Sequence, residues 1–209
     1  VRRDVRGAHD DRAPHAVAAP HSRPHPPRAR YTSAPIPEPG GLLTTVDPAE
    51  FTRTMAHVPT PVTIVTTVDV AGRRWGFTAS SFSSLSLDPP LILVCPAKTA
   101  SCHGAFVSAR RFLVNVLASD QREIAGTFAR SGGDKFGGSP MVPCESGLPG
   151  LPAATARLAC ALHEVLDGGD HSILVGRVES VFLSGAEPLI YHNRRFTQPT
   201  AGSALAASS

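Results

Sequence analysis

The stretch of residues 76–101 most constrains how this chain can fold. It reads GFTASSFSSLSLDPPLILVCPAKTAS, in which small hydroxyl residues alternate with bulky apolar ones before a Pro-Pro pair and an apolar run at 91–95. Alternation with a period of two is typical of a half-buried strand, and a short apolar run is typical of a fully buried one. We therefore expect two strands here, followed by the start of a helix near residue 98.

Hydroxyl and basic side chains gather at the ends of these predicted elements. They are Thr78, Ser80 and Ser81 at the first strand, and Lys98, Thr99 and Ser101 after the second. Where a strand gives way to a helix, free backbone N–H groups point outward and favour an anion. The pattern predicts a site for a phosphate-bearing ligand.

Length and charge limit the number of domains and the classes of function that this chain can have. A chain of 209 residues suits one domain with a tail. Residues 1–40 hold seven Arg and four acidic residues, whereas 41–209 hold thirteen charges of each sign, so the net charge of +3 belongs to the tail. A neutral domain gives no electrostatic case for nucleic-acid binding. The sequence also has no apolar run of the roughly 18 residues that a membrane span needs.

The chain divides into a domain and two tails. Residues 1–41 are rich in Pro, Arg, His and Ala, and we expect them to be disordered because they cannot bury enough apolar surface. Residues 42–198 form the predicted domain, and 199–209 a flexible C-terminal tail. Four cysteines without a C-x-x-C pair or a secretory signal indicate reduced thiols in a cytoplasmic protein, with Cys95 and Cys160 in the core.

Hydrophobic periodicity and helix-capping residues predict the other helices and strands. Asp47 and Pro48 begin a helix whose apolar face holds Phe51, Met55 and Val58, and further short helices are expected at 99–109 and after 121. A long loop follows at 131–150. The first strand of the 76–101 stretch begins at residue 75 and ends at 81, and the other predicted strands are 62–68, 111–117, 155–166, 172–183 and 189–192. Six or seven strands with few helices indicate a mainly β protein, a closed antiparallel barrel.

The run GFTASSFSSLSLDPPLILVC resembles the signature of the small flavin reductases. Asp134-Lys135-Phe136 and Gly169-Asp170-His171 match this family further along the chain, and the resemblance covers residues 51–196. It implies the FMN-binding split β-barrel, a homodimer with flavin near the subunit interface, and NAD(P)H:flavin oxidoreductase activity. Such reductases use NADH or NADPH to reduce FMN or FAD for a partner flavin-dependent monooxygenase.

The resemblance also implies flavin-binding residues. Thr78, Ala79, Ser80 and Ser81 would lie along the flavin ring and ribityl chain; alternatively, they are small strand residues that pack against a neighbour. The flavin phosphate would be held by Lys98, Thr99 and Ser101. The backbone from Cys95 to Ala97 would approach the pyrimidine edge.

Other residues are implied at the nicotinamide side. His171 would position the nicotinamide beside the flavin, or else it merely caps a hairpin, and Asp170 would fix the turn. Lys135 and Phe136 would close over the flavin or the nucleotide. Tyr191, Arg194 and Arg195 would be rim residues that meet the nucleotide phosphates.

Hydride transfer between nicotinamide and flavin needs the protein mainly to bind both rings and stabilise charge. A G-x-G-x-x-G motif after a strand is missing from the sequence, which argues against a Rossmann dinucleotide site. Two alternatives stay open: a split-barrel enzyme of another activity, such as a pyridoxamine-phosphate-oxidase-like oxidase, and a non-enzymatic flavin carrier. The sequence does not choose between FMN and FAD or between NADH and NADPH.

Overall fold

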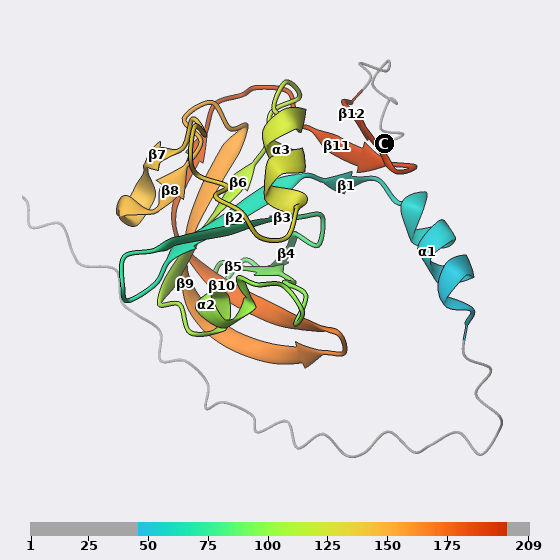
Figure 1. The fold of residues 1–209 in the computed structure, drawn as a ribbon, viewed down its shortest axis with the longest axis horizontal. Coiled ribbons are helices and arrows are strands. Elements are labelled where there is room, and N and C mark those ends of the chain that lie inside the picture. Colours follow the sequence, from blue (N-terminus) through green and yellow to red (C-terminus); the bar gives the residue numbers. More distant parts are fainter. Residues whose placement is uncertain (1–45, 200–209) are drawn as a thin grey trace, which may run out of the picture. The chain divides into compact units, whose positions relative to one another are not determined.

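The structure is a computed structural model that describes residues 46–199. Its largest element is an antiparallel sheet of seven strands in the order β3-β2-β6-β9-β10-β5-β4 (Figure 1). In chain order these are β2 (Thr63–Val68), β3 (Arg74–Ala79), β4 (Ser83–Ser86), β5 (Leu91–Val94), β6 (Arg111–Val116), β9 (Ala156–Gly168) and β10 (His171–Leu183). The predicted mainly β, antiparallel fold is confirmed. The predicted tail 1–41 and residues 200–209 lie outside the described range.

Strand β2 lies inside the sheet, between β3 and β6. Its β-branched residues suit a strand that is buried on both faces, and its first five residues are buried. Buried hydroxyls need partners. Thr63 Oγ1 donates to the Ala79 carbonyl at 2.9 Å, and Thr67 Oγ1 donates to the Arg111 carbonyl at 2.7 Å. These bonds tie β2 to both neighbouring strands.

The hairpin of β9 and β10 is the longest in the structure, with thirteen residues in each strand. Its turn contains Gly169 with a φ of 78°, a left-handed conformation that glycine adopts without a steric penalty. Beyond β9, β10 also pairs with β5 through the register Leu174↔Val94. The hairpin therefore brings His171, its first β10 residue, beside the segment that follows β5.

Three α-helices are present in the described range. These are α1 (Pro48–Ala56), α2 (His103–Val107) and α3 (Arg122–Ala129). Helix α1 begins as predicted, since Asp47 Oδ1 accepts a hydrogen bond from the Ala49 N–H at 3.0 Å. Its apolar face is exposed, however, including 59% of Phe51. Helix α2 is shorter than predicted but buries Phe106 completely, and α3 buries Phe128.

Short strands complete the fold, and several differ from the prediction. The expected loop at 131–150 contains β7 (Val142–Pro143), a 3₁₀ turn at Glu145–Gly147, and β8 (Pro149–Gly150). The stretch 76–101 holds part of β3 and the whole of β4 and β5, one strand more than predicted. β1 (Thr60–Pro61), β11 (Ile190–His192) and β12 (Arg195–Thr197) form a second sheet in which β12 was not predicted.

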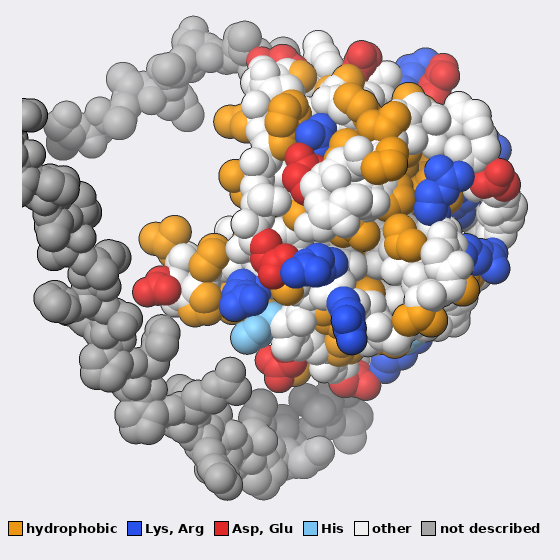
Figure 2. All heavy atoms as spheres, turned by 90° about the vertical axis from the view of Figure 1, so that its left-hand side faces the viewer, with side chains coloured by type: hydrophobic (Ala, Val, Ile, Leu, Met, Phe, Trp, Pro, Cys, Tyr) orange, Lys and Arg blue, Asp and Glu red, His pale blue; other side chains and the backbone are white. Residues whose placement is uncertain are grey.

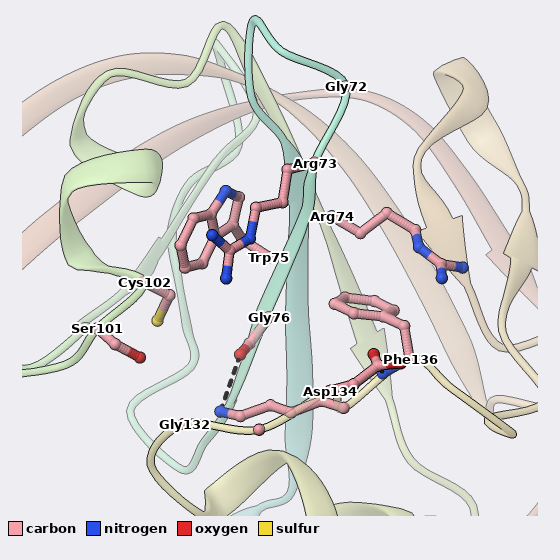
Figure 3. A pocket seen from close by; sticks show the side chains of 12 residues that line it. Gly72, Arg73, Arg74, Trp75, Gly76, Ser101, Cys102, Gly132, Asp134 and Phe136 are labelled. Carbon is pink, nitrogen blue, oxygen red and sulfur yellow. Dashed lines mark hydrogen bonds between the residues drawn. The ribbon is translucent and has the colours of Figure 1, made fainter.

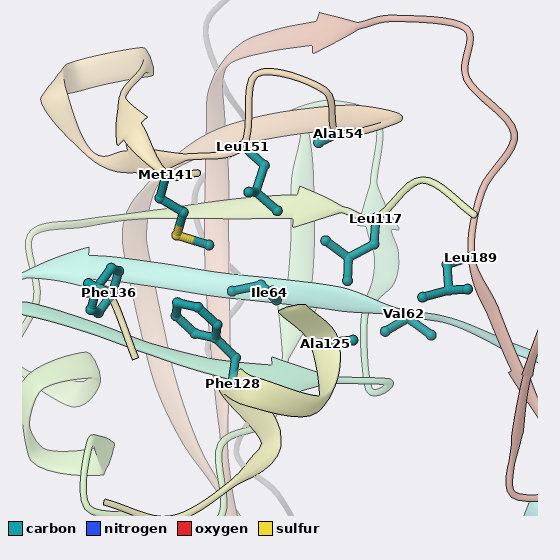
Figure 4. Close-up of a cluster of buried hydrophobic side chains, with 10 residues drawn as sticks. All are labelled: Val62, Ile64, Leu117, Ala125, Phe128, Phe136, Met141, Leu151, Ala154 and Leu189. Atoms are coloured by element: carbon teal, nitrogen blue, oxygen red, sulfur yellow. The ribbon is translucent and has the colours of Figure 1, made fainter. Parts of the chain in front are cut away.

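The larger sheet is packed on two sides by apolar clusters. One cluster joins α3 and the 131–150 loop to the sheet, and Figure 4 shows Phe128 and Phe136 of this cluster near Ile64. The two phenyl rings meet edge to face, with centroids 5.1 Å apart. A second cluster gathers around Phe106 and Phe112. On the face shown in Figure 2, apolar side chains are exposed between basic and acidic ones.

All four cysteines are free thiols. Cys160 is fully buried, as predicted, and burial raises its pKa to about 12. Cys95 was expected in the core but is only half-buried, because it sits where β5 ends and the chain turns outward. No helix within residues 46–199 is both long and apolar enough to cross a membrane.

Candidate active site

One cavity collects half of the predicted site residues. This cavity, here cavity A, has a volume of about 250 Å³ and lies between β3, the turn after β5, the end of α3 and the start of β10. The predicted residues that line it are Thr78, Cys95, Ala97, Thr99, Ser101, Lys135 and His171. They come from four separate segments of the chain, and the fold brings them together.

The turn at 95–102 forms one wall of cavity A. The hairpin tip fixes this turn, because the Lys98 N–H donates to the Asp170 carbonyl at 2.9 Å and the Ser172 N–H donates to the Pro96 carbonyl at 3.0 Å. Within residues 46–199, the hydroxyls and backbone N–H groups of Thr99 and Ser101 have no hydrogen-bond partner. Both residues can therefore donate to an anionic group in the cavity.

Lys98 does not line cavity A. Its Nζ lies 2.9 Å from Asp167 Oδ2 on the β9–β10 hairpin, and this hydrogen-bonded ion pair lowers the pKa of Asp167. The lysine is therefore partly neutralised by a carboxylate. An anion in the cavity would have to compete with Asp167 for this ammonium group.

His171 faces cavity A from the beginning of β10. Its Nδ1 lies 2.7 Å from Asp170 Oδ1, a contact that lowers the pKa of Asp170. Because an ionised carboxylate can only accept hydrogen bonds, Nδ1 carries the proton and Nε2 is left for another partner. Asp170 thus orients the ring through a contact between neighbouring residues. The sequence had predicted that Asp170 fixes the turn.

Lys135 is the cation in the wall of cavity A that lies deepest. Its Nζ donates to the Phe128 carbonyl at 3.0 Å and to the Gly76 carbonyl at 3.3 Å, which connects the loop to α3 and β3. Partial burial lowers its pKa, because desolvation penalises the charged form, while the nearby Cys102 acts in the opposite direction. Its hydrogen-bond partners in the described chain are neutral carbonyls.

The predicted residues in the 78–81 run mostly bond or pack within the protein. Thr78 Oγ1 donates to the Ala125 carbonyl at 2.6 Å, although Thr78 also lines cavity A. Ser81 Oγ accepts from the Cys95 N–H at 2.9 Å, and Ala79 is buried in the second core cluster. Ser80 is exposed and lies outside the cavity lining. These contacts fit the alternative in which small residues pack between strands.

Phe136 and the three predicted rim residues lie elsewhere. Phe136 is buried against Phe128, with one side turned to a second cavity described below. Tyr191 on β11 and Arg195 on β12 belong to the smaller sheet, and neither lines cavity A or the second cavity. Arg194, next to them, has a φ of 59° in the turn between these strands.

The second cavity, here cavity B, was not predicted. It has a volume of about 620 Å³ and is lined by Arg73, Arg74 and Trp75 at the start of β3 and by the glycine-rich loop 132–136 (Figure 3). The sequence predicted a long loop at 131–150, which contains these residues. It also shows two arginines before the chain's single tryptophan, but nothing in the sequence places the loop against them.

The sequence matches one family model over residues 55–200, and this model describes the flavin reductase like domain. The match covers more than half of the chain. The chain belongs to the flavin reductase family.

Curated flavin reductase relatives agree with this assignment. The NADH:riboflavin 5'-phosphate oxidoreductase of Streptomyces pristinaespiralis is 41% identical over 158 residues, which are 74% of this chain and 90% of that protein. The reductase component of the flavin-dependent trigonelline monooxygenase of Acinetobacter baylyi is 39% identical over 138 residues. This second match covers 66% of the chain but only 44% of the Acinetobacter protein, so the chain spans less than half the length of that relative.

A solved flavin reductase has a similar fold. The NADH:FAD oxidoreductase of Streptomyces globisporus, determined in complex with NAD and FAD fragments, is 34% identical and superposes with a TM-score of 0.69. The superposition covers 78% of this chain and 98% of the other. The split-barrel fold expected for a flavin reductase is confirmed.

Proposed function

We propose that this flavin reductase-like chain is an NAD(P)H:flavin oxidoreductase. It transfers hydride from NADH or NADPH to FMN or FAD and supplies the reduced flavin to a partner monooxygenase. The observation that carries this proposal is cavity A, where unpaired donors of Thr99 and Ser101, the ammonium of Lys135 and the ring of His171 converge. Flavin supplies the hydride acceptor, so the chain's residues need only bind, orient and balance charge.

The lining of cavity A fits a flavin nucleotide. Thr99 and Ser101 offer hydroxyl and amide donors of the kind that bind phosphate oxygens. Lys135 adds a positive charge to the lining, and this charge would favour a ligand that gains negative charge on reduction. His171, oriented by Asp170, presents Nε2 for a polar group of the nicotinamide.

The names of the relatives favour a flavin reductase over the oxidase and the flavin carrier. The Streptomyces pristinaespiralis relative is by name an oxidoreductase that acts with NADH and riboflavin 5'-phosphate, and the Acinetobacter relative serves a monooxygenase. Both names fit a reductase better than an oxidase of pyridoxamine-phosphate type or a non-enzymatic carrier. The oxidation assay below distinguishes FMN from FAD and NADH from NADPH.

The direct test is oxidation of NADH and NADPH by the purified protein, followed by absorbance, with and without added FMN, FAD and riboflavin. We expect oxidation that requires flavin and saturates with it. A protein that binds flavin but never oxidises either nicotinamide would contradict the proposal and favour the carrier alternative.

His171 provides a sharper test of the site. We expect His171→Ala to raise the KM for the reduced nicotinamide several-fold while the thermal unfolding midpoint stays close to that of the wild type. The matched control is His163→Ala, because His163 is exposed on β9 and lines neither cavity. Equal KM values for the two variants would remove His171 from the nicotinamide site.

We further propose a cytoplasmic homodimer. The four free thiols fit a reducing compartment, and the exposed apolar side chains of Phe51 and Met55 on α1 and of Val58 just after it offer part of a subunit contact. Light scattering after size-exclusion chromatography would give the mass. A monomer at micromolar concentration would contradict the dimer.

A further inference from the structure

The turn at 95–102 carries a cation that is bound outside cavity A. Lys98 lies between Ala97 and Thr99 in the chain, and both of these neighbours line the cavity. The ammonium group of Lys98 instead contacts the carboxylate of Asp167 on the β9–β10 hairpin, with Nζ 2.9 Å from Oδ2. A lysine side chain is a flexible four-carbon stem that ends in a compact charge. This ammonium group can therefore turn from the hairpin to the edge of the cavity.

Asp167 holds the lysine and the hairpin turn at the same time. Its Oδ1 accepts a hydrogen bond from the Gly169 N–H at 2.8 Å, while Oδ2 accepts from Lys98. The same hairpin tip presents Asp170, whose backbone carbonyl accepts from the Lys98 N–H at 2.9 Å. The pKa of Asp170 is lowered mainly by its hydrogen bond with His171 and to a smaller degree by the charge of Lys98. One ammonium group thus balances two carboxylates at this tip.

The turn consequently offers a phosphate only neutral donors. Thr99 and Ser101 supply hydroxyl and amide groups that lack partners within residues 46–199. Lys135 and Arg130 also line cavity A, but they come from the 131–150 loop and from the end of α3. Hydrogen bonds between neutral groups are about half as strong as charge-assisted ones. A phosphate at this turn is therefore held more weakly than it would be with Lys98 bound to it.

We propose that Asp167 limits how tightly the flavin is held, because it keeps Lys98 on the hairpin and withholds this ammonium group from the flavin phosphate. The inference rests on the proposed reductase function, in which reduced flavin must leave for a partner monooxygenase. Affinity differences between closely related complexes arise mainly in the rate of dissociation. Asp167 thus keeps the flavin exchangeable, and it determines flavin affinity without touching the ligand.

Asp167→Asn tests this role because it removes the charge and keeps the shape. The amide oxygen can still accept from the Gly169 N–H, whereas Lys98 loses its carboxylate. The ion pair is weak, since the two side chains are 39% and 78% exposed, and a charge-assisted bond to phosphate is stronger. We expect the Kd for FMN to fall about threefold to tenfold. Riboflavin has no phosphate, so its Kd should stay unchanged.

Quenching of flavin fluorescence during titration gives both Kd values, and stopped-flow displacement gives the rates of release. FMN release from Asp167→Asn should slow by about the factor by which its Kd falls. The matched control is Glu164→Gln, which removes the same charge from an exposed residue of β9 outside both cavities and should change neither quantity. The double variant of Asp167→Asn with Lys98→Gln should lose the gain in affinity, because the ammonium group is then absent.

Two results would overturn the proposal. One is an Asp167→Asn protein whose ratio of the FMN Kd to the riboflavin Kd equals that of the wild type. The other is a Lys98→Gln protein that binds FMN about tenfold more weakly than the wild type, because Lys98 would then already hold the phosphate. The titrations contain no nicotinamide. A protein that oxidises neither NADH nor NADPH would therefore refute the reductase function without changing their outcome.

Discussion

Replacing Gly76 with alanine tests the packing that holds the two cavities in place. Gly76 lies within β3, opposite the edge-to-face pair of Phe128 and Phe136. A Cβ built on it would lie 2.7 Å from Phe128 Cε1 and 3.3 Å from Phe136 Cζ, and the first distance is far inside van der Waals contact. The rings have little room to retreat, because Phe128 is 1% exposed and Phe136 is 8% exposed.

The expected cost follows from two opposing effects. Forcing an extra methyl group into a packed core costs about 1–3 kcal/mol. Replacing glycine by alanine also removes backbone freedom from the unfolded chain, which stabilises the folded state by about 0.5–1 kcal/mol. We therefore expect Gly76→Ala to lower the free energy of unfolding by about 1–2 kcal/mol, or the melting temperature by about 2–8 °C for a domain of this size.

Urea denaturation followed by fluorescence and circular dichroism measures this difference. The matched control is Gly126→Ala in α3, where a Cβ would meet nothing within 4 Å, so the helix should gain about 0.5–1 kcal/mol. The two glycine-to-alanine changes should thus have opposite signs. A Gly76→Ala protein as stable as the wild type would refute the packing described for Phe128 and Phe136.

Three further predictions concern single contacts. Glu145→Gln should destabilise the protein by about 2 kcal/mol in urea denaturation, because it leaves the mostly buried Arg157 guanidinium without its carboxylate partner; unchanged stability would contradict this. The hydrogen bond from Trp75 lowers the pKa of Asp69 below 3.8. The ionised Asp69 carboxylate therefore stabilises the folded protein above about pH 4, and this stabilisation is lost as the pH falls through the folded-state pKa. In acid titrations, Asp69→Asn should show neither this loss of stability nor the change in tryptophan fluorescence that accompanies it in the wild type. Ser101→Ala should weaken FMN binding by about 1 kcal/mol in titration, and an unaltered Kd would place the phosphate elsewhere.

Much of the fold could be predicted because it depends on local patterns. The β-branched run of β2, the alternation in β9 and β10, and the Asp47-Pro48 start of α1 each report a local backbone preference. The errors occur where tertiary context decides. β12 lacks a pattern of its own and is a strand because β11 lies beside it, with Tyr191 opposite Phe196.

The site was predicted in part for a similar reason. Residues 95–101 and His171 could be found because their motifs resemble a family, and the hairpin register does place them together, through the bridge between Ala97 and His171. Ser81 shows the limit of that approach. A serine in a strand can face a ligand or bond to its own sheet, and only the position of the Cys95 N–H shows that the second arrangement is present.

Lys135 illustrates how the two cavities depend on one another. It is the only cation in the described chain that lines both cavities A and B, and the carbonyls that hold it belong to β3 and α3. Gly76 is 59 residues away in sequence, so no local pattern could connect the two. Because β3 is an edge strand, its outward carbonyls have no neighbouring strand on that side, and the Gly76 carbonyl can accept from a side chain instead. The edge of the sheet thus supplies an anchor for a positive charge, and that charge lies in the wall that cavities A and B share.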